Sequence, residues 1–278
     1  MKVSVIMGIY GEKNMQQVQK AVESILNQTW KDLEFIIFQD GYDRPTVKLL
    51  KKLAKEDSRI VLMGESRNHG LAYALNHCIE AADGTYIARM EADDIAHPER
   101  LKTQIAFLEK NPKYGFVGCN ARLIDDNGIW GERKMPERPQ KEDFLPYSPY
   151  IHPSVVFRTE ILQEIGGYPD TVETIRLEDY ELFMQLYARG VQGYNIQKSL
   201  LDYREDRKAY GKKKYRYRIR ECGVRYRGFK KMGITGIKVW VYTIKPLIVG
   251  LVPVWVLEKL KLRKGRRELH NEKKVKTV

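Results

Sequence analysis

Cysteine is scarce in this chain, and its spacing does not suit metal or disulfide chemistry. The three cysteines, Cys78, Cys119 and Cys222, are odd in number and widely separated, and no Cys-x-x-Cys pair occurs. This disfavours a zinc site and a disulfide framework, and it favours a reducing compartment. A long apolar run near the start is also missing. Only the short run at residues 3–9 is mainly apolar there, so we expect no secretion signal.

The net charge of +13 is unevenly distributed along the 278 residues. Residues 1–203 carry 25 Lys and Arg against 30 Asp and Glu, whereas residues 204–278 carry 24 against 6. The basic residues are therefore concentrated in the tail, and the positive charge indicates which partners the tail can bind. With 43% hydrophobic residues, the chain can hold one large α/β domain plus an appendage, or two modest domains.

Apolar runs alternate with helical patterns through the first 110 residues. Strands are predicted at 3–9, 33–38, 60–63 and 86–88, and helical patterns follow each of them, including 71–82 and 99–110. This alternation indicates βαβ units on a mainly parallel sheet that is covered by helices on both faces.

The pattern is less regular beyond residue 110. We predict a strand at 114–120, a hairpin at 122–130 that turns at 126–128, and a long loop at 131–150. A strand at 154–157, a short helix ending at Gly166-Gly167 and a helix containing 177–182 complete this part.

Polar side chains stand where several of the predicted strands end. Tyr10 follows the first strand, Gln39 and Asp40 end the second, and Asp93 and Asp94 follow the strand at 86–88. Ligands of open parallel sheets bind beyond the carboxyl ends of the strands. These side chains therefore predict a crevice with the dimensions of a nucleotide.

Three carboxylates, Glu91, Asp93 and Asp94, lie close together in this sequence. Like charges at this spacing repel one another unless a cation or hydrogen-bond donors intervene. Oxygen ligands suit Mg²⁺ or Mn²⁺, which would then bind a phosphorylated substrate. The alternative is a solvated acidic loop that caps the following helix, with Asp94 near its N-terminus.

Six segments together carry a family resemblance: SVIMGIY, SILNQTWKDLEFII, NHGLAYALN, RMEADDIAHPERL, HPSVVFR and LEDYELFMQL. Over residues 2–204 the chain resembles the family-2 inverting glycosyltransferases, which have a GT-A nucleotide-sugar-binding fold. The resemblance implies transfer of a sugar from a nucleotide-diphosphate sugar, with inversion at the anomeric carbon. It also implies a GT-A catalytic domain at 1–203, with a nucleotide-sugar-binding half at 1–110 and an acceptor-side half at 111–203.

The resemblance also implies roles for single residues. The acidic metal motif of the family falls on Glu91-Ala92-Asp93, with Glu in place of the usual first Asp, and we expect Asp93 and Asp94 to bind the metal. The catalytic base falls on Asp179, beside Glu178. Nucleotide-sugar-contacting positions fall on Ile9, Tyr10, Gln39, Asp40, Asn68 and Gly70, and also on the motif Glu91-Ala92-Asp93. Many relatives have two aspartates where this chain has Gln39-Asp40.

Two of these assignments have plainer alternatives. Acidic residues such as Glu178 and Asp179 are common at the start of a helix whether or not they are catalytic. His152 precedes a predicted strand, where it either contacts the acceptor or the diphosphate or only orders the loop beside Pro153.

Two absent motifs bear on the reaction. The QxxRW signature of processive relatives does not follow Asp179, which favours one sugar per encounter. A sugar-phosphate nucleotidyltransferase is the enzymatic alternative, but its phosphate loop would carry a basic residue near 8–12, and none is present. A non-enzymatic module that binds nucleic acid or membrane is the other alternative, and it leaves the acidic strand ends unexplained.

The tail, residues 204–278, is basic and partly apolar. Residues 207–231 interleave Arg and Lys with Tyr, a pattern that suits nucleic acid or an anionic membrane. Residues 234–257 are apolar but are interrupted by Lys245, Pro246 and Pro253. We interpret the tail as a helical interfacial anchor on the inner face of the plasma membrane, with a spanning helix or a packed helical pair as alternatives.

Membrane attachment would suit an acceptor that is itself membrane-bound. We therefore expect a cytoplasmic, peripheral enzyme of the bacterial type, acting on a lipid-linked saccharide in the synthesis of capsule, exopolysaccharide or lipopolysaccharide. Nucleic acid is the less favoured partner.

Overall fold

The computed structural model describes residues 1–12, 14–205, 215–253, 255–257, 259–260 and 262–263. Strands and helices alternate in its first half: β1 (Val3–Ile9), α1 (Met15–Leu26), β2 (Leu33–Asp40), α2 (Arg44–Glu56), β3 (Ile60–Glu65), α3 (Leu71–Ala81), β4 (Tyr86–Arg89), β5 (Ile95–Ala96) and α4 (Arg100–Lys110). The first two helices begin at side-chain caps, because Asn14 and Asp43 each accept hydrogen bonds from backbone N–H groups of the first turn.

The second half is less regular. It contains β6 (Tyr114–Asp125), β7 (Gly128–Arg133), two short 3₁₀ helices (Lys141–Phe144 and His152–Ser154), β8 (Val156–Arg158), α5 (Thr159–Ile165), α6 (Glu178–Ala188), β9 (Gln192–Arg204), α7 (Tyr215–Lys231) and α8 (Ile237–Leu251).

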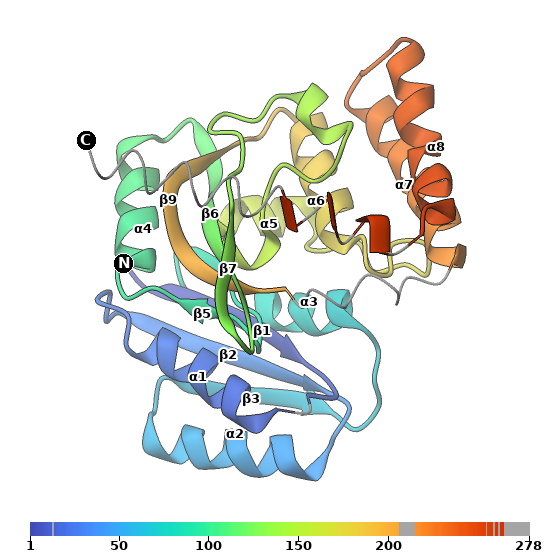
Figure 1. The fold of residues 1–278 in the computed structure, drawn as a ribbon. Helices are drawn as coiled ribbons and strands as arrows, with labels where there is room; N and C mark the ends of the chain where they lie inside the picture. The colour runs from blue at the N-terminus through green and yellow to red at the C-terminus, as the bar shows by residue number, and fades with distance from the viewer. Residues whose placement is uncertain (13, 206–214, 254, 258, 261, 264–278) are drawn as a thin grey trace, which may run out of the picture.

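Within the described residues, one nine-stranded sheet has the order β3-β2-β1-β4-β8-β6-β9-β5, with β7 paired to β6 (Figure 1). The pairings of β1 with β2 and β4, of β2 with β3 and of β6 with β9 are parallel, whereas β5, β7 and β8 run in the opposite direction. The mainly parallel α/β sheet is therefore confirmed. β1 lies between β2 and β4, so the strand order reverses there.

Some predicted boundaries are confirmed and others are wrong. The hairpin is present, with Asp125 paired to Gly128 across its turn, but β7 runs on to Arg133 and shortens the predicted loop. The strand predicted at 154–157 begins only at Val156, because residues 152–154 form a 3₁₀ turn. β9, a strand of 13 residues that pairs with β6 and β5, is not predicted by the sequence pattern at all.

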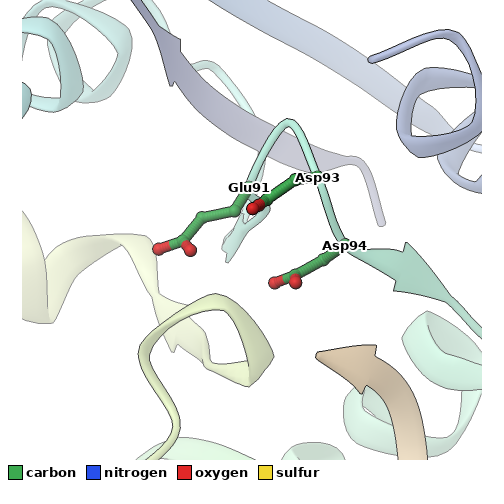
Figure 2. A group of neighbouring side chains, drawn as sticks. All are labelled: Glu91, Asp93 and Asp94. Carbon is green, nitrogen blue, oxygen red and sulfur yellow. The ribbon is translucent and has the colours of Figure 1, made fainter. Parts of the chain in front are cut away.

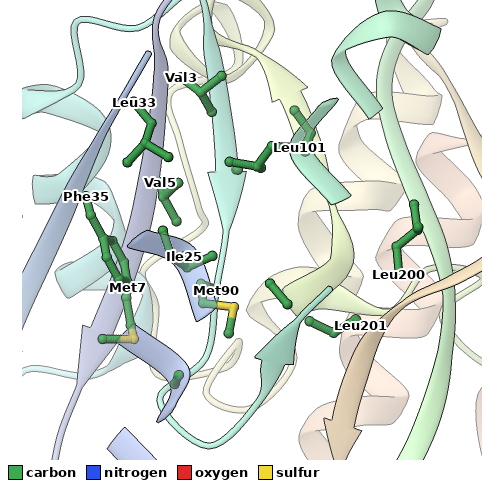
Figure 3. Close-up of a cluster of buried hydrophobic side chains, with 14 of the residues drawn as sticks. Val3, Val5, Met7, Ile25, Leu33, Phe35, Met90, Leu101, Leu200 and Leu201 are labelled. Atoms are coloured by element: carbon green, nitrogen blue, oxygen red, sulfur yellow. The ribbon is translucent and has the colours of Figure 1, made fainter. Parts of the chain in front are cut away.

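Both faces of β1 and β2 are buried, which explains why apolar residues predominate in their sequences without strict alternation. One face carries the cluster of Figure 3, in which Val5 and Phe35 pack beneath Ile25 of α1. The other face, with Ile6 and Ile36, packs beneath α3 and is continuous with the side chains of α6. Helices on both faces thus fix the strands whose ends form the site.

The described part of the tail is a helical pair that packs on the catalytic part. α7 lies against α6, and α8 lies against α7 (Figure 1). Gly228 of α7 permits this approach, because a Cβ there would lie 2.3 Å from Sδ of Met184 in α6. In the described part of the chain, no helix combines the length and apolar content that crossing a bilayer requires. Residues 206–214 and 264–278 of the predicted tail lie outside the described residues.

Candidate functional site

A cavity of about 540 Å³ lies beyond the carboxyl ends of β1 and β4, where the strand order reverses. This is the place at which open parallel sheets bind ligands. Of the residues predicted to contact the nucleotide, the following line the cavity: Ile9, Tyr10, Asp40, Asn68, Gly70, Glu91, Ala92 and Asp93. Predicted residues from four separate segments thus meet at one opening.

Asp40 ends β2 and organises one wall of this cavity. Its Oδ2 accepts hydrogen bonds from Asn68 Nδ2 and from Gly70 N, both at 2.7 Å, and its Oδ1 accepts one from His69 N at 2.7 Å. The carboxylate is buried, so these three donors replace the water it loses. Asp40 therefore holds the loop that starts α3, and Asn68 is fixed by that same bond.

Gln39 departs from the prediction. It is buried and is absent from the lining of the cavity that contains its neighbour Asp40. Adjacent residues of a strand point to opposite faces of the sheet, so only one member of this pair can face the opening.

The three predicted carboxylates meet at the turn between β4 and β5. Figure 2 shows Glu91, Asp93 and Asp94 around this turn, and their ligand oxygens all lie within 4.8 Å of one another. Arg204, the last residue of β9, holds the turn in place. Its backbone N donates to Asp94 Oδ1 at 2.8 Å, and its Nε donates to the backbone O of Asp93 at 3.3 Å.

The electrostatics of this cluster favour a cation. Burial, followed by the charges of Glu91 and Asp93, raises the pKa of Asp94 well above its usual range. Burial also raises the pKa of Glu91 to about 7, with Asp93 and Asp179 adding to the effect and Arg89 opposing it. Among the described residues, Asp94 Oδ2 is buried without a hydrogen-bond partner. An all-oxygen donor set with an unsatisfied buried oxygen fits Mg²⁺ or Mn²⁺.

Glu91 also contacts basic side chains behind the cavity. Its Oε1 lies 3.5 Å from Nη2 of Arg89, which is 1% exposed, and 3.7 Å from Nδ1 of His152. Burial and the nearby Arg89 lower the pKa of His152 well below its usual value, so the imidazole is neutral and its contact with Glu91 is not an ion pair. His152 Nε2 is hydrogen-bonded to Tyr168 OH at 2.8 Å.

A second cavity, of about 1120 Å³, opens on the other side of the carboxylates. Asp179 and His152 line it, as do side chains of the loop at 147–153. The two cavities share five lining residues: Leu71, Glu91, Asp93, Arg176 and Glu178. Glu91, Asp93 and Glu178 thus form a wall between two adjoining spaces, whereas Asp94 is buried behind it and lines neither cavity.

Glu178 and Asp179 lie in the first turn of α6. Glu178 is buried, its Oε1 accepts a hydrogen bond from the backbone N of Arg176 at 2.9 Å, and burial raises its pKa. Asp179 lies near enough to Glu91 to raise the pKa of that carboxyl. Of the two, Glu178 lines both cavities, whereas Asp179 lines the second.

Glu12 and Arg176 are among the site residues that sequence reasoning misses. Glu12 lines the first cavity, and burial together with Asp93 and Asp43 raises its pKa. Its position just beyond the first strand is the signal that could have identified it. Arg176 lines both cavities and has a left-handed backbone, with φ of 68°. No sequence pattern predicts a left-handed backbone at an arginine.

A reversing parallel sheet with acidic residues at its switch point defines the class of α/β enzymes that bind nucleotides at strand ends. Within that class, the chain belongs to glycosyl transferase family 2, because its residues 4–166 match the model of that family. The predicted family is therefore confirmed, and the protein is a glycosyltransferase.

Individual relatives agree with this membership. The chain is 34% identical to EpsE of Bacillus subtilis (strain 168) over 259 residues, which cover 93% of this chain and 92% of EpsE. It is 29% identical, over 88% of this chain and 94% of the relative, to WfaP of Escherichia coli, a UDP-Glc:α-D-GlcNAc-diphosphoundecaprenol β-1,3-glucosyltransferase.

A solved structure supports the GT-A-like fold. The mannosyltransferase PcManGT from Pyrobaculum calidifontis, in complex with GDP-Man and Mn²⁺, superposes with a TM-score of 0.62 at 17% sequence identity. The match covers 93% of this chain and 79% of PcManGT.

Proposed function

We propose that this glycosyltransferase moves one sugar, with inversion, from a nucleoside-diphosphate sugar to a saccharide acceptor. The observation that carries the proposal is the pair of adjoining cavities with a shared wall of carboxylates. A donor in the first cavity and an acceptor in the second would meet at Glu91, Asp93 and Glu178. Inversion requires the acceptor to approach from the side opposite the leaving group, and two spaces on either side of one wall suit that geometry.

The donor would occupy the cavity at the ends of β1 and β4. Ile9, Tyr10 and the loop of Asn68 and Gly70 would hold the nucleoside, and the segment Glu91-Ala92-Asp93 would face the diphosphate. Asp93, with Asp94 beside it, would hold Mg²⁺ or Mn²⁺, in keeping with the Mn²⁺ complex of PcManGT. When bound, that cation stabilises the negative charge that the departing diphosphate gains.

Asp179 would be the general base. A sugar hydroxyl is a weak nucleophile, and removal of its proton by a positioned carboxylate contributes roughly 10²–10⁴-fold to the rate. Asp179 lines the second cavity, and Glu178 next to it accepts the backbone N–H of Arg176, which fixes the start of α6. Neutral His152 would contact the acceptor from the same side.

The acceptor that we propose is a lipid-linked saccharide, as the name of WfaP states for that relative. The enzyme would then add one sugar per encounter during synthesis of a cell-surface polysaccharide such as capsule. We assign residues 1–110 to the donor, residues 111–203 to the acceptor, and the basic tail, residues 204–278, to the anionic inner face of the plasma membrane. The net basic charge of that tail supports the last assignment.

Product analysis tests this function. The protein is incubated with UDP-, GDP- or dTDP-sugars and Mn²⁺, and the products are separated. A transferase releases a nucleoside diphosphate, with water as a slow acceptor. A parallel incubation supplies a nucleoside triphosphate and a sugar 1-phosphate, from which a nucleotidyltransferase releases pyrophosphate. Pyrophosphate in that incubation, with no nucleoside diphosphate from the sugar nucleotides, would contradict the proposal.

The variant Asp179→Asn tests the base. We expect donor affinity to stay close to that of the wild type, while turnover falls by about 10²–10⁴-fold because the amide cannot accept the proton. Glu181→Gln is the matched control, since it removes the same charge from the same turn of α6 but lines neither cavity. Turnover of Asp179→Asn equal to that of the control would refute the assigned base.

A further inference from the structure

The outer face of α8 is a continuous apolar stripe. Six of its residues are exposed and recur at spacings of one, three or four along the helix: Ile237, Trp240, Val241, Ile244, Ile248 and Leu251. At 3.6 residues per turn, these positions cover one side about 100° wide. Ile237 and Leu251, at its two ends, are each 77% exposed. The opposite side, with Val239, Thr243 and Pro246, is buried against the protein.

Basic side chains adjoin this stripe. The ring of Trp240 packs against that of Tyr226 of α7, with centroids 5.6 Å apart, so the exposed faces of the two helices meet. Arg227 follows Tyr226, and Lys230 lies one turn further along the same face of α7. Glu221 is the single acidic residue of α7 and α8, and it pairs with Arg225.

We infer that the stripe of α8, with the adjoining face of α7, is the surface that docks on an anionic lipid bilayer. An apolar stripe flanked by cations matches the acyl boundary and the anionic headgroups of such a surface. α8 has 15 residues and is therefore about 22 Å long, which suits a helix that lies in the interface. The inference rests on the proposed function in one respect: the bilayer on which α8 docks is taken to be the membrane that carries the proposed lipid-linked acceptor.

The same helices hold the acceptor-side cavity. Arg225 of α7 is buried, and its Nη1 donates to the backbone O of Leu145 at 2.6 Å. Lys245 of α8 donates from Nζ to the backbone O of Pro146 at 3.1 Å. The next residues, Tyr147 and Ser148, line the second cavity. Docking through α8 therefore places that cavity beside the lipid surface.

Vesicle sedimentation tests the docking surface without requiring any activity. The full chain is mixed with vesicles of phosphatidylcholine and phosphatidylglycerol, or of phosphatidylcholine alone. We expect binding to the anionic vesicles, and at least about tenfold weaker binding for the double variant Ile244→Asp/Ile248→Asp, because each side chain loses its apolar transfer free energy. The matched control is Ile129→Asp, which changes an exposed isoleucine of β7.

Three results would overturn the inference. These are binding of the double variant equal to that of the wild type, equal loss in the Ile129→Asp control, or a dimer that the double variant dissociates, which would make a second copy the occupant of the stripe. A nucleoside-diphosphate titration with Mn²⁺ on the same samples separates the two proposals. If nucleotide binding fails while vesicle binding behaves as expected, the proposed function is wrong and the docking surface stands.

Discussion

At the scale of single residues, Glu91 links the acidic cluster to pH. Its pKa is raised from 4.5 to about 7, chiefly by burial. In the absence of a metal, the folded state therefore binds a proton more tightly than the unfolded state. The sign follows directly: this carboxyl lowers the stability of the fold as pH rises between about 4.5 and 7.

Binding of a divalent cation should oppose that loss. The cation displaces the proton of Glu91, so we expect affinity for Mn²⁺ to fall by up to about tenfold per pH unit below 7. The measurement is the Mn²⁺-induced shift of Tm at pH 8 and at pH 6, with the larger shift expected at pH 8. Glu91→Gln should flatten this difference, and an equal shift at both pH values in the wild type would contradict the expectation.

The residues of the site were predictable to different extents. That Glu91 and Asp93 lie close together could be predicted, because the two residues are neighbours in the sequence at the end of an apolar strand. The treatment of Gln39 and Asp40 as a pair ignores the alternation of side chains along β2, and only Asp40 lines the cavity. The bonds that make Asp40 an organiser of residues 68–70 depend on folding of α3 onto β2, which no local pattern encodes.

At the scale of elements, apolar runs located the parallel strands because those strands are buried on both faces. β9 escaped prediction because its sequence, QGYNIQKSLLDYR, mixes exposed and buried positions without strict alternation. Its pairing with β6 contains register shifts, which interrupt the periodicity on which a prediction relies. A strand can thus be predicted from its sequence where burial is uniform along its length, as in β1 and β2, and not where burial changes from residue to residue, as in β9.

The contact between α6 and α7 predicts opposite effects for two glycines of α7. Gly228→Ala would place a Cβ against Met184, which is buried, so we expect a loss of about 1–3 kcal/mol in the free energy of unfolding. Gly223 has room, since its nearest neighbour is the end of the flexible Arg227 side chain at 3.4 Å. We therefore expect Gly223→Ala to raise the free energy of unfolding by up to about 1 kcal/mol, because alanine has a higher helix propensity than glycine.

Denaturant unfolding of Gly228→Ala and Gly223→Ala measures the two changes in the free energy of unfolding. Because α6 carries Asp179, we also expect Gly228→Ala to lower turnover, whereas Gly223→Ala should keep it. Equal stability of the two variants would mean that α7 does not pack on α6 as closely as the structure describes.

At the scale of the whole molecule, composition divides the chain after residue 203, but the packing crosses that boundary. Arg204 holds the turn of Asp93 and Asp94. Further along, Val224, Phe229 and Met232 belong to the same buried cluster as Phe183 of α6. A change in net charge along the sequence concerns the exposed side chains and the partners they can bind. It does not show which apolar side chains complete the buried core.

This packing predicts how truncation acts. A chain ending at Tyr203 loses Arg204 and uncovers the apolar side of α6, and each large side chain removed from the cluster costs about 1.5–3 kcal/mol of burial. Since a domain is stable by only about 5–15 kcal/mol, we expect this chain to lose cooperative thermal unfolding. A chain ending at Pro253 keeps α7 and α8 and should melt close to the wild type. Cooperative unfolding and Mn²⁺ binding by the shorter chain would show that the catalytic part folds without these helices, and the tail would then act on partners alone.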